Sequence, residues 1–484
     1  MTAIARPPIE PLRPAPTHAH HTPEQLDRLK QATLDILEHV GVQIQSLKAL
    51  DLLAEHGVAV DRGTQIARFP QELVLTAMSG APGRFALGAR DAACDIAVGD
   101  GGTYCTTDGC GVEIVDFGSR ERRASTKADV ADISRLQDYL SSIAFWWPTL
   151  SAGDKGETAQ LHELDAGWNN TVKHLQGMVN GEREARYAVE MATVIAGGAE
   201  ELRRRPVLSN LLGTISPLVV DKDAIEAALV FAAAGVPVTF VTMPTLGTTA
   251  PATRAGAYAV GAAELVAASV VVQLAYPGAP LLHSIMQSTA DPRSGGFISF
   301  PLDGRGRALS TELAHHWGVP AESAACGTDS AVPGTWQAGV EEALDLAQAA
   351  REGSDLMPSI GLLNVYTLFS PEHLILGDDI YQRARYSVLD IDFDDESFAL
   401  EAVAEVGPGG HFLGHKHTRR HMRESCLPAI THQPGPDGAF RDPVDVAREK
   451  AEWLWREYRP QPLEEDKAAE LTRILAAADA ELRG

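Results

Sequence analysis

The sequence predicts an α/β protein built on a (β/α)8 (TIM) barrel, with an α+β extension before it and helices after it. From about Ser125 onward, helical segments alternate with short apolar runs. Seven such runs occur, and short apolar strands are typical of a parallel sheet buried on both faces. One more strand, from the region of Tyr104 or Val112, would make the eight that close a barrel.

The N-terminal part predicts a short leader and then a small α+β region. Residues 1–21 are rich in Pro, Ala and His and lack the apolar stretch of a signal peptide, so we expect a disordered leader. Thr22 to Gln25 spell a capping box with proline at the first helical position, and apolar residues follow at helical spacing up to Gly41. A second helix at 46–56 and short extended runs between 58 and 117 complete a region that we place at 22–125.

The barrel domain is predicted at 126–440 and the C-terminal helices at 441–484. The expected pairs of helix and strand are 127–140 with 143–150, 159–171 with 175–179, 182–196 with 207–215, 221–234 with 238–243, 254–275 with 281–285, 311–317 with 322–326, and 337–352 with 356–363. Glycine-rich nucleotide-binding signatures are missing, which argues against a doubly wound sheet. The charged terminal helices lead us to expect a homo-oligomer.

Composition narrows the class of partner. The chain has 484 residues, with 41 Lys and Arg against 65 Asp and Glu, a net charge of −24. Such an acidic protein is a poor ligand for nucleic acid. Five scattered cysteines do not make a disulfide framework, which favours the reducing cytoplasm, and the longest uncharged apolar run, 265–276, is too short to span a membrane.

The candidate site residues follow from the rule that barrel chemistry lies at the carboxyl ends of the strands. They are aromatic, thioether and polar groups rather than paired carboxylates, and an aromatic face attracts a quaternary ammonium group. Simple core packing is the alternative role for each of them. The predicted substrate-binding residues are Tyr104, Trp146, Trp147, Met243, His283, Gln287, Asp329, Trp336 and Asn364.

Metal-ligand patterns are weak. His411, His415, His417 and His421 have helical spacing in part, but glycines and three basic residues interrupt them, and Cys105 and Cys110 have no second pair. We therefore predict no metal site and assign no single catalytic residue.

Four blocks of sequence nevertheless resemble a known family. They are 115–118 (VDFG) with 123–129 (RASTKAD), 238–251 (VTFVTMPTLGTTAP), 327–333 (GTDSAVP) with 337–339 (QAG), and 406–413 (VGPGGHFL). In these blocks the chain resembles the trimethylamine methyltransferase-like family of corrinoid-dependent methyltransferases, over nearly its whole length.

The resemblance implies a barrel enzyme that passes a methyl group from a methylated amine to the cob(I)alamin of a separate corrinoid protein, with no cofactor bound permanently. Trimethylamine-specific members look to have pyrrolysine at or next to the position of Gly327, where this chain has only standard residues. Members without pyrrolysine resemble glycine betaine methyltransferases. The expected substrate is therefore a quaternary amine, glycine betaine or a related betaine, whose nitrogen leaves as a neutral amine without acid or metal.

Two other functions stay open on the sequence. A zinc-dependent barrel methyltransferase would need three ligands from His283, His315, His316, Cys326 and Cys426. A non-catalytic betaine-binding protein would bind the amine without transferring its methyl group.

Overall fold

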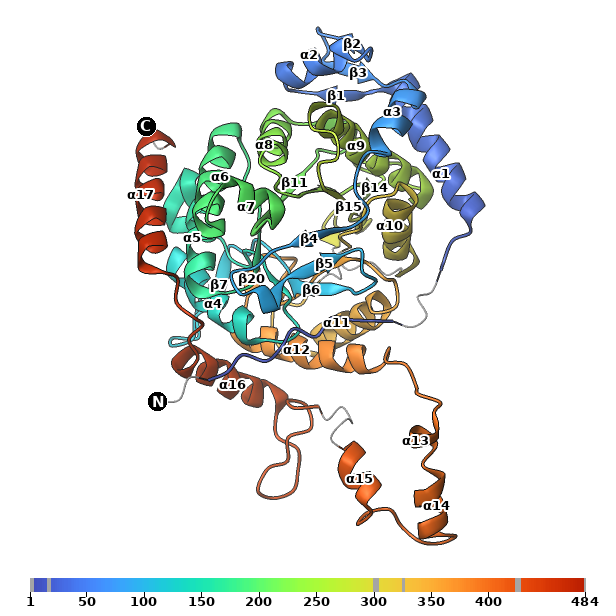
Figure 1. Cartoon of the computed structure of the whole chain (residues 1–484), viewed down its shortest axis with the longest axis vertical. Helices are drawn as coiled ribbons and strands as arrows, with labels where there is room; N and C mark the ends of the chain where they lie inside the picture. The colour runs from blue at the N-terminus through green and yellow to red at the C-terminus, as the bar shows by residue number, and fades with distance from the viewer. Residues whose placement is uncertain (1–3, 15–18, 299–303, 324–326, 423–427, 483–484) are drawn as a thin grey trace.

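The computed structural model describes residues 4–14, 19–298, 304–323, 327–422 and 428–482. In Figure 1, helices follow one another around a central group of strands. They are α4 (Lys127–Tyr139), α5 (Ala159–Asn170), α6 (Glu182–Ala196), α8 (Lys222–Ala233), α9 (Arg254–Ala275), α10 (Gly304–His316), α11 (Trp336–Ala349) and α12 (Pro371–Tyr386). The predicted alternation is confirmed for six of the seven pairs of helix and strand, with a short extra helix, α7 (Ala199–Arg204), after α6. Of the strand predicted at 322–326, Glu322 forms an isolated bridge, and residues 324–326 lie outside the described residues.

The central strands form parallel sheets, as their apolar composition predicts. The larger sheet contains five strands in the order β15 (Leu281–Ile285), β13 (Val238–Thr242), β11 (Leu208–Gly213), β10 (His174–Gly177) and β9 (Phe145–Trp146). A second sheet pairs β6 (Tyr104–Thr107) with β18 (Leu356–Ile360), also in parallel. The strand expected from the Tyr104 region is therefore present.

Isolated contacts link the two sheets. His283 of β15 bridges Ala321, and the next residue, Glu322, bridges Leu356 of β18. On the other side, the amide of Ala144 donates to the carbonyl of Cys105 at 2.7 Å. The continuous ladders stay separate among the described residues, so the closed barrel remains a prediction.

The N-terminal region is α+β, as predicted. The capping box at Thr22 starts α1 (Pro23–Asp35), which runs into a π-helical turn, and α2 (Leu47–Glu55) and α3 (Gln71–Met78) follow. The strands β1 (Val42–Ile44), β2 (Ala59–Asp61) and β3 (Ile66–Arg68) form one sheet with β12 (Val219–Val220). The hairpin of β4 (Phe85–Leu87) and β5 (Ile96–Val98) packs on the side chains of Tyr104, Phe145 and Leu356, at the amino ends of the central strands.

The predicted disordered leader is wrong over residues 4–14. Leu12 is fully buried, and its backbone pairs with Thr103 just before β6. The Tyr381 hydroxyl donates to the carbonyl of Glu10 at 2.7 Å. A buried leucine and backbone pairing outweigh the proline-rich composition here.

The longest helix, α9, is apolar and long enough to cross a membrane by length and composition alone. Its most apolar window is 83% buried within the protein, where the helix packs on α1, α3 and β13. It is one of the helices that surround the central strands.

Two small sheets lie in the connections that leave the carboxyl ends of the central strands. One contains β14 (Thr245–Leu246), β16 (Ser288–Ala290) and β17 (Phe297–Ile298). The other contains β19 (Leu362–Leu363), β20 (Leu368–Phe369), β7 (Glu113–Val115) and β8 (Arg122–Ala124). Both therefore belong to the end of the strands where barrel enzymes place their sites.

The predicted C-terminal helices are confirmed, and they cover the chain's own helices. The first, α16 (Pro443–Glu457), packs on α12 and α4, and α17 (Glu465–Leu482) packs on α6 and α5. Between α12 and α16 the chain leaves the body, with α13 (Asp395–Phe398), α14 (Leu400–Val406) and α15 (Lys416–His421) in an extension at the lower right of Figure 1. We call residues 389–422 the arm; the sequence had placed them inside the barrel domain.

Candidate active site

An apolar wall forms where the central strands end. It consists of Trp147, Leu211 and Val241, which are buried together, with Met178 and Met286 packed against them. These five residues come from the ends of β9, β10, β11, β13 and β15, so five parallel strands deliver them to one place. We call them the aromatic–methionine wall.

Trp147 is the aromatic member of this wall. Its indole Nε1 is buried and finds no acceptor in the part of the chain that the structure describes. The backbone of Gly109 lies close to the ring: a Cβ at this position would come within 2.8 Å of Trp147 Cε2, so the contact requires glycine. The thiol of Cys110 is 3.0 Å from the Met178 sulfur. Soft sulfur atoms and an aromatic face suit a methylated cation better than an anion.

A buried carboxyl lies one layer deeper. The Glu322 Oε2 atom accepts from Gln176 Nε2 at 2.9 Å and from Thr239 Oγ1 at 2.6 Å. Glu322 Oε1 is buried and has no hydrogen-bond donor among the described residues. Burial outweighs both hydrogen bonds and raises the pKa of Glu322 to about 7.

Strand periodicity stacks this carboxyl under the wall. Gln176 and Met178 are two residues apart at β10 and therefore lie on the same face of the strand. The same holds for Thr239 and Val241 on β13. Residues two apart on a strand point the same way and lie roughly 6.6 Å apart. The site therefore has an apolar upper layer and an acidic lower one.

A second buried carboxyl, Asp108, ends the β6 strand. It accepts from the amide of Gly109 at 2.9 Å and from the amide of Gly327 at 3.4 Å. Burial raises the pKa of Asp108 to about 7 in spite of these two bonds. Asp108 thus ties the end of β6 to the loop that begins at Gly327.

A strained loop stands beside the Gly327 loop. Asn364, Val365 and Tyr366 have φ angles of 52°, 54° and 63°, in the left-handed region that non-glycine residues rarely occupy. The amide of Asn364 donates to the carbonyl of Ser330 at 2.8 Å, which joins the two loops. Such backbone strain clusters at functional sites.

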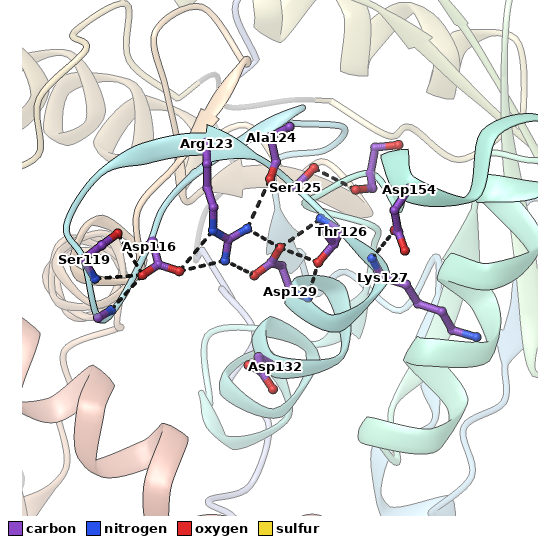
Figure 2. A network of polar contacts seen from close by, with 12 residues as sticks. Asp116, Ser119, Arg123, Ala124, Ser125, Thr126, Lys127, Asp129, Asp132 and Asp154 are labelled. Atoms are coloured by element: carbon purple, nitrogen blue, oxygen red, sulfur yellow. Dashed lines mark hydrogen bonds and ion pairs between the residues drawn. The ribbon is translucent and has the colours of Figure 1, made fainter.

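A polar network joins the β7–β8 hairpin to the start of α4 (Figure 2). Arg123 donates to Asp116 Oδ2 at 2.8 Å and to both oxygens of Asp129 at 2.7 and 2.8 Å. Asp129 also caps α4 through Thr126, and the Arg123 and Thr126 bonds outweigh burial, so the pKa of Asp129 is lowered. This network fastens the hairpin to the helix that precedes β9.

The chain also resembles known proteins as a whole. The profile of the trimethylamine methyltransferase family matches residues 4–482. The chain belongs to this family. It is 30% identical to the trimethylamine methyltransferase of Desulfitobacterium hafniense (strain DSM 10664 / DCB-2), over 95% of this chain and 93% of that protein.

The chain is also similar to a second curated protein and to a solved structure. A glycine betaine methyltransferase of Desulfitobacterium hafniense (strain Y51) is 27% identical over 94% of this chain and 96% of its own length. The crystal structure of the monomethylamine methyltransferase of Methanosarcina barkeri aligns with a TM-score of 0.45 and 11% identity, over 95% of this chain and 92% of the other.

In this family member, only some of the residues predicted for the site come together. Trp147 is in the wall, and Gln287 follows Met286 with a buried Oε1 that has no donor in the described chain. Asn364 is in the strained loop. Asp329 lies in the adjoining loop, where its amide donates to Glu341 Oε2 at 3.0 Å.

Trp146 and His283 point to the other face of their strands. The Trp146 indole donates to Ser134 Oγ of α4 at 2.7 Å, and His283 Nε2 is 2.8 Å from Ser269 Oγ of α9. Burial lowers the pKa of His283 to about 3. Both side chains therefore pack against the surrounding helices rather than the strand interior, because neighbouring strand residues alternate between faces.

Tyr104, Met243 and Trp336 lie apart from the wall. Tyr104 starts β6, at the amino end, and its hydroxyl donates to Asp100 at 2.9 Å. Met243 follows β13 and is 53% exposed, and Trp336 at the start of α11 is 86% exposed. Neither of the last two is enclosed in a cage by the described chain.

The ligands required for zinc are not brought together. His315 pairs with Asp355 and His316 with Asp27, each at a different place from His283. Cys326 and Cys426 lie outside the described residues. Within the described residues, groups of three or more His, Cys, Asp or Glu able to hold a metal are absent.

Sequence reasoning missed Glu322, Asp108 and Met286 as site residues. Glu322 stands at the start of a predicted strand, where an acidic residue reads as exposed. Asp108 precedes a glycine, the usual mark of a turn. The signal that could have found them is a carboxylate inside or directly after an otherwise apolar strand. Burying a carboxylate costs free energy, so such a residue is a candidate for a functional site.

Proposed function

We propose that this protein is a methyltransferase that takes a methyl group from a quaternary amine, glycine betaine or a related betaine, and passes it to cob(I)alamin on a partner corrinoid protein. Family membership supports methyl transfer. The observation that carries the substrate class is the aromatic–methionine wall stacked on the buried Glu322 carboxyl.

This arrangement suits a permanent cation. The Trp147 ring attracts an ammonium group through its quadrupole, and the two methionines pack on N-methyl groups. Glu322, one layer below, supplies negative charge at low dielectric when it is ionised. A cation in the pocket in turn favours ionised Glu322, so binding lowers the pKa of that group.

The chemical step needs little from the protein beyond position. The carbon–nitrogen bond breaks, its electron pair stays on nitrogen, and the amine leaves uncharged. The reduced corrinoid supplies the electron pair that forms the new bond to carbon. The chain's residues hold the cation, exclude water and aim one methyl group outward toward the mouth.

The choice of a quaternary over a tertiary amine rests on the Gly327 loop and on the glycine betaine methyltransferase relative. At and around Gly327 this chain has only standard residues, whereas the trimethylamine-specific members look to have pyrrolysine there. Gly327 has a structural reason to be glycine: a Cβ would lie 2.7 Å from the carbonyl oxygen of Leu362.

The remaining proposals concern architecture. We propose that the bridges around Ala321 and Ala144 close an eight-stranded (β/α)8 barrel. Of the domains 22–125, 126–440 and 441–484, the first then contributes one strand, β6, to the barrel of the second. We propose that the substrate contacts Trp147, Gln287, Asp329 and Asn364. Met243 and Trp336 lie at the rim of the site, and Tyr104, Trp146 and His283 do not contact the substrate. The cytoplasm remains the proposed location, because the three cysteines among the described residues are free thiols.

The test is a substrate panel with two readouts. Calorimetry measures binding of glycine betaine, longer betaines and trimethylamine, and absorbance follows methylation of free cobalamin reduced to the Co(I) state. We expect one betaine to bind and to methylate the cobalamin. Trimethylamine as the preferred donor would refute the substrate class. Binding without methylation would favour a betaine-binding protein, and activity that needs stoichiometric zinc would favour the zinc enzyme.

A further inference from the structure

The arm exposes large apolar side chains. Leu413 is 85% exposed, Phe393 74%, Ile391 71% and Leu400 68%. Further exposed apolar residues of the arm are Leu389, Phe398, Val403, Phe412 and Met422. Such a concentration is unusual for a surface that meets only water.

The arm has little packing of its own. In the described chain, α13, α14 and α15 make no extensive contact with any other helix or strand, whereas α16 and α17 both pack on the body. Figure 1 shows these three helices standing away from the ring of helices, beyond α12. The apolar side chains of the arm are therefore not edges of the main core.

The exposed area is large enough for a stable contact. An aromatic side chain offers about 150–250 Å², so the three exposed phenylalanines alone contribute roughly 300 Å², and the leucines, isoleucine, valine and methionine more than double that. A stable interface needs about 800 Å² from each partner, and an isolated monomer rarely exposes a patch of more than a few hundred.

The charges of the arm suit a second copy of the same arm. Within one arm, Arg420 of α15 already pairs with Glu396, and His415 and Lys416 pair with Glu405. Asp392 and Glu401 in the first half of the arm and Arg419 of α15 have no ion-pair partner in the described chain, so these three charges are free to meet those of a second arm. Between α14 and α15 lies an open cleft of about 800 Å³. Two-fold pairing would set the acidic half of each arm against the basic helix of the other.

The position of the arm disfavours the methyl acceptor as its partner. The arm leaves the body after Tyr386, at the end of α12 where Gln382 contacts Ser141 and Tyr381 contacts Glu10. Ser141 follows the end of α4, on the side of the amino ends of the strands. A corrinoid must instead reach the carboxyl ends, where the wall lies.

We propose that the arm is a self-association surface, which binds the arm of a second copy of this chain in a two-fold contact. The proposal does not depend on the methyl-transfer activity, because the arm contributes none of the wall or carboxyl residues.

The experiment is sedimentation velocity of the full chain between about 0.5 and 50 µM. We expect twice the chain mass of 51.7 kDa at the upper concentrations. Replacing Leu400 and Leu413 together by Glu should raise the dissociation constant at least about 30-fold, because each change puts a charge into an apolar contact. The control is Leu47→Glu on α2, another exposed leucine (59%) at the far side of the molecule, which should leave the mass unchanged.

Two outcomes overturn the proposal: wild-type protein that stays monomeric at 50 µM, or an arm variant that dimerises as the wild type does. Phe393→Glu tests the same surface independently, and the circular dichroism of each variant checks its fold. If the arm variants stay monomeric but still bind the amine, self-association is independent of the proposed function, and each proposal can fail without the other.

Discussion

Glu322 couples substrate charge to proton binding. Because a cation favours the ionised carboxyl, we expect the affinity for the amine to rise between pH 5.5 and 8.5, through the pKa of about 7. Glu322→Gln should weaken binding about tenfold at pH 8 and flatten this profile, since a tenfold change corresponds to about 1.4 kcal/mol. Calorimetry across this pH range measures both effects. The control is Glu226→Gln, a buried carboxylate on α8 that accepts from Ser46 and should leave the profile intact.

The same group makes the protein less stable at high pH. The pKa of Glu322 is higher in the folded chain than the value near 4.3 of an unfolded glutamate. Its stabilising effect is therefore full below about pH 4.3 and lost as the pH rises through 7. Glu322→Gln should be more stable than wild type by roughly 2–3 kcal/mol at pH 8 and about equal to it at pH 4.5. Denaturant unfolding at the two pH values measures the difference; a variant destabilised at pH 8 would contradict it.

Trp147 and Trp146 give a matched pair of substitutions. Trp147→Leu should lower amine affinity about 30-fold, because a desolvated cation–π contact contributes about 2 kcal/mol, while Trp147→Phe should keep part of it. Trp146→Phe loses the bond to Ser134 and should lower the melting temperature without changing affinity. Equal losses of affinity from Trp146→Phe and Trp147→Leu would mean that the wall does not bind the amine.

The same pair shows what a sequence can predict at this scale. Alternation requires that Trp146 and Trp147 face opposite sides, but two adjacent tryptophans do not reveal which side is the interior. The residues that decide it, Ser134 and Gly109, lie on a helix and just after the end of another strand. Glu322 was missed for a related reason: only the fold shows that Gln176 and Thr239 meet it.

At the scale of elements, the β7–β8 hairpin depends on one guanidinium. Arg123→Met should leave the buried Asp129 without its strongest partner and loosen the hairpin (Figure 2). We expect chymotrypsin to cleave after Phe117, within the hairpin turn, about tenfold faster, which corresponds to about 1.4 kcal/mol of local opening. Arg122→Met, which loses only its pair with the half-buried Glu113, should change the rate little, because Arg122 itself is exposed and its pair is screened by water. Equal rates in both variants would show that the Arg123 network does not hold the hairpin.

Elements with strong periodicity were predictable, and those decided by distant contacts were not. The Thr22 capping box and the helix–strand pairs are local signals; the capping box and six of the seven pairs are confirmed. The packing of Leu12 beside Thr103 joins segments about ninety residues apart, so composition alone suggested disorder. The sequence did not show that residues 389–422 leave the body, because the three helices there are short and give no strong periodic signal that separates them from a loop of the barrel.

For the whole molecule, the open question is whether the parallel strands form a ring. The larger sheet would have two edges, β9 and β15, if it were open. Edge strands leave backbone groups unpaired, and these must face water or another chain. Yet the amide of Ala144 beside β9 already donates to Cys105, and His283 of β15 already pairs with Ala321. These contacts favour closure, with one strand for each of the helices α4, α5, α6, α8, α9, α10, α11 and α12.

Hydrogen exchange tests closure directly, because a barrel has no edge from which opening can start. In a closed barrel, peptides covering 104–107, 143–147 and 320–323 should exchange as slowly as those covering β11 and β13, since all then open only with the global unfolding of the domain. In an open sheet, the peptides of β9 and β15 should exchange at least about tenfold faster than those of β11, the central strand. Solvent-exposed β2, a true edge strand of the N-terminal sheet, provides the fast reference in the same experiment. If β9 and β15 exchanged at the rate of β2, the site would lie on an open sheet, and Glu322 would lose the low-dielectric surroundings on which its raised pKa and its affinity for a cation both depend.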